Sequence, residues 1–145
     1  SSSPQNGCPP DRMKRLEHIG IAVSDLDQAE RIFGDILGIP AYKREEVAGE
    51  AVLTSFFQAG DSKVELLVPT SPDSAIAKHL EKRGPGLHHI AFHVEDLEAE
   101  LGRLVDMGYR VVVGPKSGAD GKRIAFLHPS DSAKVLVELC ADAHS

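Results

Sequence analysis

Two histidines and two glutamates stand at matching positions in the two halves of this chain. His18 in LEHIGIAVSDL matches His89 in LHHIAFHVEDL, and Glu65 in KVELLV matches Glu138 in VLVELC. Each glutamate interrupts an apolar run, where an unpaired carboxylate would be costly to bury. Two imidazoles and two carboxylates form an N₂O₂ set that suits a divalent first-row ion such as Co²⁺, Ni²⁺, Mn²⁺ or Zn²⁺. The repeat therefore predicts one metal site to which both halves contribute.

Taken singly, each of these residues also has an ordinary structural explanation. A lone histidine in a strand is more often a hydrogen-bonded structural residue, and a lone glutamate more often faces solvent. The agreement of all four positions across the repeat favours the metal site. By strand alternation His88 should point away from His89, so we expect a structural role for it. The small residues Gly20 and Ala91, two positions after each histidine, should leave room for a substrate.

The segments around these residues predict the order βαβββ in each half. RLEHIGIAV alternates as a strand, and Asp25 then begins a helix with a capping box to Gln28. In the second half the strand is expected at residues 87–94, and Asp96 begins the helix. Further strands are expected at residues 41–46, 52–58, 63–68, 109–113, 122–128 and 134–139, and a connector helix at 74–83.

Two βαβββ units predict an α+β fold. Each unit covers one face of its sheet with a helix, so the two bare faces can pair into an open barrel with a central cleft. The expected organisation is a disordered leader at residues 1–13, a single domain at 14–141 and a tail at 142–145. Within the domain, the expected units are module one (15–69), a connector (70–86) and module two (87–141).

Composition limits the classes of partner. A length of 145 residues fits one domain, and a net charge of -6 without a long basic run argues against nucleic acid. No apolar run approaches the roughly 18 residues of a membrane span, and SSSPQNGCPPDR lacks the apolar core of a secretory signal. We expect no disulfide between Cys8 and Cys140, and two free thiols suit a reducing, cytoplasmic location.

Several longer motifs resemble a known family. The paired βαβββ units with their His…Glu…His…Glu set resemble the vicinal-oxygen-chelate superfamily. PTSPDSAIAKHLEKRGPGLHHIAFHVEDLEA and KRIAFLHPSDSAKVLVEL are similar to the methylmalonyl-CoA epimerase family within it, and the resemblance runs from about Leu16 to Cys140. It implies an isomerase that interconverts the two C2 epimers of methylmalonyl-CoA. It also implies a homodimer and a divalent metal cofactor, with Co²⁺ favoured.

The resemblance further implies roles for individual residues. The metal would hold the thioester and carboxylate oxygens and stabilise the enolate, and Glu138 would act as both ligand and base. The family's second base is a glutamate on the third strand, and an ungapped comparison places this position at Thr54. Glu45, Glu46 and Glu50 lie nearby but would need a register shift to enter the cleft. A metal-bound water is another candidate, so the second acid or base is left open.

The phosphates of an acyl-CoA need cations. Lys116, Lys122, Arg123 and Lys134 gather around the segment GPKSGADG, which could close over the pantetheine arm as a flexible loop. The predicted substrate contacts are Thr54, Lys122, Arg123 and Phe126.

Two other functions remain open on the sequence alone. A lactoylglutathione lyase-like enzyme would use the same four ligands, although the connector helix and the LHP motif favour the epimerase. A small-molecule binding protein of the same fold typically lacks the ligand quartet, which this chain keeps. The sequence does not name the metal or the range of 2-substituted malonyl-CoA esters accepted.

Overall fold

The computed structural model describes residues 14–143, so the expected leader at 1–13 and the last two residues of the tail lie outside it. Both halves have the expected order of elements. The first half forms β1 (Arg15–Ala22), α1 (Leu26–Leu37), β2 (Lys43–Val47), β3 (Val52–Ala59) and β4 (Ser62–Pro69). The connector forms α2 (Ala75–Arg83). The second half forms β5 (Gly86–His93), α3 (Leu97–Asp106), β6 (Val111–Ser117), β7 (Lys122–Leu127) and β8 (Val137–Asp142).

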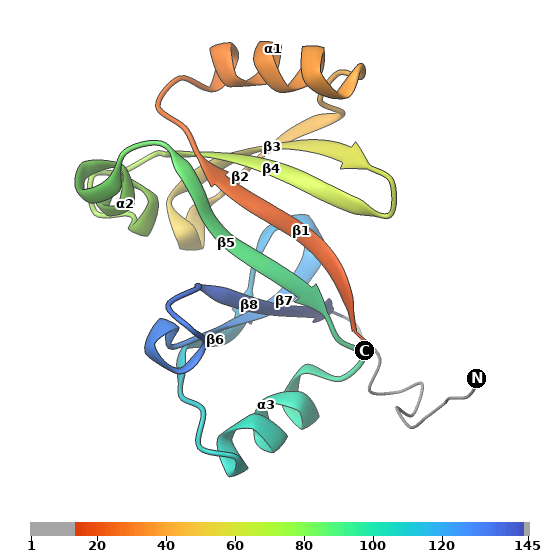
Figure 1. Ribbon diagram of the computed structural model, residues 1–145, viewed down its shortest axis with the longest axis vertical. Coiled ribbons are helices and arrows are strands. Elements are labelled where there is room, and N and C mark those ends of the chain that lie inside the picture. The colour runs from red at the N-terminus through yellow and green to blue at the C-terminus, as the bar shows by residue number, and fades with distance from the viewer. Residues whose placement is uncertain (1–13, 144–145) are drawn as a thin grey trace.

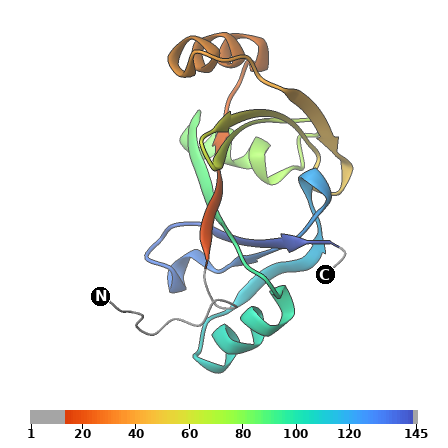
Figure 2. The ribbon, with the colours of Figure 1, turned by 90° about the vertical axis from the view of Figure 1, so that its right-hand side faces the viewer.

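The first strands of the two halves lie at the centre of one eight-stranded sheet, in the order β2-β3-β4-β1-β5-β8-β7-β6. β1 and β5 pair antiparallel with each other, and each pairs in parallel with the last strand of its own half, β4 or β8. The sheet curls into a half-barrel, with α1 and α3 outside it at opposite ends (Figures 1 and 2). The expected α+β fold of two modules around a central cleft is confirmed.

Each helix begins at a side-chain cap that the sequence indicates. Asp25 and Asp96 accept hydrogen bonds from the backbone N–H three residues on, at 3.0 and 3.1 Å. Ser74 does the same for the connector helix, at 3.0 Å. Such caps satisfy backbone donors that have no partner within the helix, and they fix where the chain leaves the preceding strand.

The apolar core lies between the helices and the outer, convex face of the sheet. Two clusters of buried side chains form this core: Leu26, Ala29, Phe57 and Leu66 under α1, and Leu97, Leu101, Leu127 and Leu139 under α3. Because each helix buries the outer face of its own module, the inner face is left for other residues. No helix in the described part of the chain combines the length and apolar character needed to cross a membrane.

The strands β8 and β6 differ most from the expected boundaries. β8 begins at Val137 because Ala133 and Lys134 adopt left-handed backbone angles, with φ of 59° and 69°, which a strand does not accommodate. β6 continues through Gly114 and Pro115 to Ser117, so half of the segment expected as a loop is strand.

Candidate active site

Each central strand carries one extra residue directly before its histidine. Before His18, the register of β1 against β5 shifts by one residue, and Glu17 is the extra residue of a β-bulge. Before His89 the shift is in the opposite sense, and His88 is the extra residue of β5. A bulge takes a residue out of the regular alternation and redirects its side chain. The expectation that His88 points away from His89 is therefore wrong: their Nδ1 atoms lie 2.9 Å apart.

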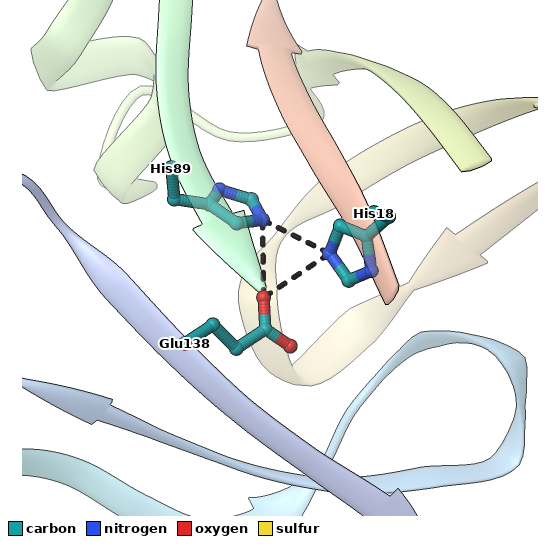
Figure 3. A group of neighbouring side chains, drawn as sticks. All are labelled: His18, His89 and Glu138. Carbon is teal, nitrogen blue, oxygen red and sulfur yellow. Dashed lines mark hydrogen bonds and ion pairs between the residues drawn. The ribbon is translucent and has the colours of Figure 1, made fainter. Parts of the chain in front are cut away.

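Three of the four predicted ligands meet at one point. His18 from β1, His89 from β5 and Glu138 from β8 point toward one another (Figure 3). The Nε2 atoms of the two histidines are 3.2 Å apart. Glu138 Oε1 lies 3.3 Å from Nε2 of His18 and 3.0 Å from Nε2 of His89. All three side chains are buried. Two imidazole nitrogens this close need a proton or a cation between them, so the donor set fits a metal ion.

Glu65, the fourth predicted ligand, lies on the other side of the His18 ring. Its Oε2 is 3.2 Å from His18 Nδ1, and the side chain is buried. Among residues 14–143 the possible ligand atoms form two groups that share His18. One group contains His89 and Glu138, and the other contains Glu17 and Glu65. The role of Glu65 as the fourth ligand therefore stays a prediction.

The small residues after each histidine make room for the opposite histidine. Gly20 pairs with His89 across the central strands, and a Cβ atom on Gly20 would lie only 2.2 Å from His89 Cε1. In the same way Ala91 pairs with His18 and is fully buried. At Gly20 the expectation of space for a substrate is wrong, because the His89 ring occupies that space.

The charges of the site favour a cation between the two histidines. Burial alone would lower the pKa of His18, but hydrogen bonds to Glu138 and Glu17 raise it to about 10. Burial alone would raise the pKa of Glu138, but hydrogen bonds from His18 and His89 lower it to about 2. Burial raises the pKa of Glu65 to about 7. The ionised carboxylate of Glu138 therefore stabilises positive charge at the point where the Nε2 atoms meet.

A cavity opens beside this cluster on the inner face of the sheet. Its empty volume is about 630 Å³, open solvent at the mouth included. Three of the predicted substrate contacts, Thr54, Phe126 and Lys122, line it together with all four predicted ligands. Arg123 is absent from its wall and forms an ion pair with Glu98 on the outside of α3. A substrate contact for Arg123 thus stays a prediction that its position does not support.

Glu50 reaches the cavity wall by a local turn. Residues Ala48–Glu50 form a 3₁₀ turn before β3, and Ala51 follows with a φ of 53°. Because of this turn, Glu50 lines the cavity without a shift in the register of β3, and Thr54 lines the same cavity. Lys116 Nζ lies 2.5 Å from Glu50 Oε2 and joins the two modules there. Gly49 was the sequence signal that the strand pattern is interrupted before Glu50.

A chain of ion pairs ties the second module to the first next to His18. Glu17 Oε1 lies 2.6 Å from His18 Nδ1, and Glu17 Oε2 lies 2.8 Å from Lys63 Nζ. Asp120 pairs with Lys63 at 2.6 Å and with Lys43 at 2.7 Å. The segment expected as a flexible loop over the cleft is thus held to β2 and β4 through Asp120.

Comparisons with known proteins agree with this architecture. Residues 17–126 match the model of the Glyoxalase/Bleomycin resistance protein/Dioxygenase superfamily. An ethylmalonyl-CoA/methylmalonyl-CoA epimerase of Cereibacter sphaeroides is 41% identical over 128 residues, which are 86% of this chain and 96% of the relative. The mitochondrial methylmalonyl-CoA epimerase of Bos taurus is 36% identical over 141 residues, 96% of this chain and 80% of the relative. A solved methylmalonyl-CoA epimerase in complex with methylmalonyl-CoA and NH4+ has a TM-score of 0.85 at 38% identity, covering 90% of this chain and 95% of that chain.

Proposed function

The chain belongs to the glyoxalase/bleomycin resistance protein/dioxygenase superfamily, and we propose that it is an isomerase that interconverts the two C2 epimers of methylmalonyl-CoA. The observation that carries the proposal is the pair of carboxylates, Glu50 and Glu138, which line one cavity beside the two facing histidines. The relatives at 36–41% identity favour this function over the lactoylglutathione lyase-like and binding-protein alternatives.

The donor set of the site supports a divalent metal cofactor. We propose that His18, His89 and Glu138 hold the ion, with Glu65 as the fourth ligand, and that the ion is Co²⁺, with Mn²⁺, Ni²⁺ and Zn²⁺ as alternatives. When bound, such an ion acts as a Lewis acid for the charge that develops on the substrate oxygens. The homodimer and the cytoplasmic location expected from the sequence stay predictions.

The two carboxylates suit proton transfer on both faces of one carbon atom. The C2 proton of methylmalonyl-CoA lies between a thioester carbonyl and a carboxylate, which makes it acidic. Inversion requires that the proton leaves from one face and that another arrives on the opposite face. Glu138 belongs to β8 and Glu50 to the turn before β3, so they reach the cavity from different modules. A well-placed acid or base contributes about 10²–10⁴-fold to such a step.

Each carboxylate has partners that could hold a negative charge in the cavity. The pKa of Glu138 is lowered by its two histidine partners, and Lys116 stands beside Glu50. We propose that the ionised carboxylate on one face removes the C2 proton and keeps it, while the other group, protonated at that stage, delivers its own proton to the opposite face; the roles are exchanged for the opposite epimer. Thr54 and Phe126 would bound the space for the small acyl group, because both line the same cavity.

The anionic arm of the substrate needs a basic surface near the cavity. Of the expected cations, Lys116 and Lys122 pair with Glu50 and Asp142, and Arg123 pairs with Glu98. Lys134 instead lines a neighbouring depression together with His79 and Arg83, and this depression shares His88 and His89 with the cavity. We place the phosphates of the acyl-CoA in that depression.

Isotope exchange tests the proposal directly. The Co²⁺-loaded protein is incubated with one methylmalonyl-CoA epimer in deuterated water, proton NMR follows C2, and a stereospecific mutase reports the other epimer. The wild-type chain should both exchange and epimerise. Glu138→Gln should lose both activities, whereas Glu50→Gln should lose epimerisation by about 10²–10⁴-fold and keep exchange of one epimer.

Glu46→Gln is the matched control, because Glu46 is an exposed acid of the neighbouring strand β2. It should keep both activities. A metal-loaded wild-type chain that exchanges no C2 proton would refute the epimerase, and the glutathione hemithioacetal would then be the substrate to test.

A further inference from the structure

The two β-bulges place a hydrogen-bonding group on the same nitrogen of each ligand histidine. Glu17 Oε1 lies 2.6 Å from His18 Nδ1, and His88 Nδ1 lies 2.9 Å from His89 Nδ1. Both contacts join neighbours in the sequence, which a regular strand would place on opposite faces. Equivalent positions in the two modules thus carry equivalent contacts.

We infer that Glu17 and His88 are positioning residues: each accepts a hydrogen bond from Nδ1–H of the next histidine and thereby directs its Nε2 to the metal. The inference rests on the metal site proposed above and concerns two residues outside its four proposed ligands. A neutral imidazole carries one proton, and the partner of one nitrogen decides which nitrogen is free to bind a metal. With both Nδ1 atoms engaged, both Nε2 atoms face the same point, 3.2 Å apart.

Glu17 is itself held in place from behind. Its second oxygen lies 2.8 Å from Lys63 Nζ, and Lys63 also contacts Asp120 at 2.6 Å. Glu17 is 3% exposed, so its carboxylate has little access to solvent. A buried carboxylate fixed by a lysine on one oxygen has its other oxygen available for a single, oriented contact with His18.

His88 is fixed by packing. Its ring meets the ring of His79 on α2 edge to face, with centroids 5.0 Å apart, and it meets the His89 ring in the same way at 5.1 Å. As an acceptor at Nδ1, His88 carries its own proton on Nε2. Connector helix α2 therefore supports the orientation of His89 through one intermediate ring.

The alternative for Glu17 is direct metal ligation. Glu17, His18 and Glu65 also lie within the reach of one ion, and an ion at that point would use Nδ1 of His18. The three-ligand cluster around Nε2 instead takes one donor from each of three strands (Figure 3). The two arrangements make different predictions for the same variants.

Metal binding with two readouts separates these cases. Co²⁺ is titrated into the metal-free wild type and into Glu17→Leu, His88→Leu and His88→Gln, and both affinity and the visible spectrum are recorded. Removal of an outer partner of a metal-bound histidine typically weakens metal affinity about 10–100-fold. We expect that loss in Glu17→Leu and His88→Leu, which cannot accept from Nδ1–H, with a stoichiometry and spectrum like those of the wild type. His88→Gln, whose amide oxygen can accept from Nδ1–H, should recover part of the affinity.

The Zn²⁺-loaded protein provides a direct view of the proposed hydrogen bonds. Proton NMR should show a protected Nδ1–H for His18 and for His89, and each leucine variant should lose the protection at the histidine that follows it. Glu46→Gln and His93→Leu, an acid of β2 and a histidine of β5 outside the cavity wall, are the controls and should bind like the wild type. Thermal unfolding of the metal-free variants verifies that each one folds.

Three results would overturn the inference. Wild-type affinity in both Glu17→Leu and His88→Leu would show that these contacts do not orient the histidines, and it would leave the proposed metal site intact. A spectrum of Glu17→Leu that departs from that of the wild type would make Glu17 a ligand and would move the ion to the Nδ1 side of His18. A wild-type chain that binds no divalent ion would refute both the proposed metal site and the positioning role.

Discussion

Replacement of Gly20 by alanine adds one methyl group at the closest approach of the two central strands. The new Cβ would lie 2.2 Å from His89 Cε1 and 2.6 Å from His89 Nδ1. Carbon atoms in contact prefer about 3.5–4.0 Å, so the ring must move by more than about 1 Å. The backbone of Gly20 is not in the left-handed region, so any effect comes from the side chain and not from backbone strain.

The expected loss follows from the size of this displacement. Catalytic geometries have a tolerance of about 0.5 Å, and a misplacement of 1 Å can reduce the rate about 10²-fold. Overpacking of a buried site also costs about 1–3 kcal/mol of stability. We therefore expect Gly20→Ala to lower kcat/KM for epimerisation by about 10²-fold and to weaken Co²⁺ binding, because His89 Nε2 no longer meets its partners.

Coupled epimerase kinetics, Co²⁺ titration and urea unfolding of Gly20→Ala measure these effects separately. Gly102→Ala is the matched control, since a Cβ there meets no atom within 4 Å. In the interior of α3 this alanine should raise stability by up to about 1 kcal/mol and leave kcat/KM unchanged. If Gly20→Ala keeps wild-type metal affinity and turnover, the glycine is not needed to accommodate His89, and the steric reasoning fails.

Three further predictions concern stability and reactivity. The pKa of His18 is near 6.5 in the unfolded chain and is raised to about 10 in the fold, so protonated His18 stabilises the folded state fully below pH 6.5 and loses this effect as pH rises through 10. The urea midpoint of the metal-free chain should therefore fall between these two pH values, and His18→Gln should make that fall smaller. Asp96→Ala removes the N-cap of α3 and should lower the free energy of unfolding, measured in urea, by about 1 kcal/mol. Asp106→Ala at the C-terminal end of the same helix should leave this free energy unchanged or raise it slightly, and equal losses in the two variants would contradict the capping role of Asp96. Burial raises the pKa of the Cys140 thiol far above its usual range, so an alkylating reagent should modify this thiol only after unfolding. Peptide mapping locates the label, and rapid labelling of Cys140 in the native chain would show that the thiol is accessible.

The features that the sequence predicted well depend on local patterns. The alternation around His18, the caps at Asp25 and Asp96, and the repeat itself are all visible within short windows, and the structure has each of them. The convergence of His18, His89 and Glu138 followed from the repeat because equivalent strands pair at the centre of the sheet.

The features that the sequence did not reveal depend on the register between distant strands. Glu17 and His88 are redirected by bulges, and a bulge exists only relative to the partner strand, so alternation within one strand misplaced His88. The space beside Gly20 is filled by a residue of the other module for the same reason. Glu50 was expected to need a register shift to enter the cleft, because the spacing along the chain does not show that the turn at Ala48–Glu50 brings it to the cavity wall.

The antiparallel pairing of β1 with β5 divides the site between two half-chains. Module one carries His18 and Glu65, module two carries His89 and Glu138, and neither has the set alone. A single βαβββ unit could complete such a site only by associating with a second copy in the same antiparallel way. The connector makes that association intramolecular, and it allows the two copies to diverge, as they have done at Glu17 and His88. A quasi-symmetric pocket whose two sides are adjusted independently suits a reaction whose substrate and product differ only in handedness at one carbon atom.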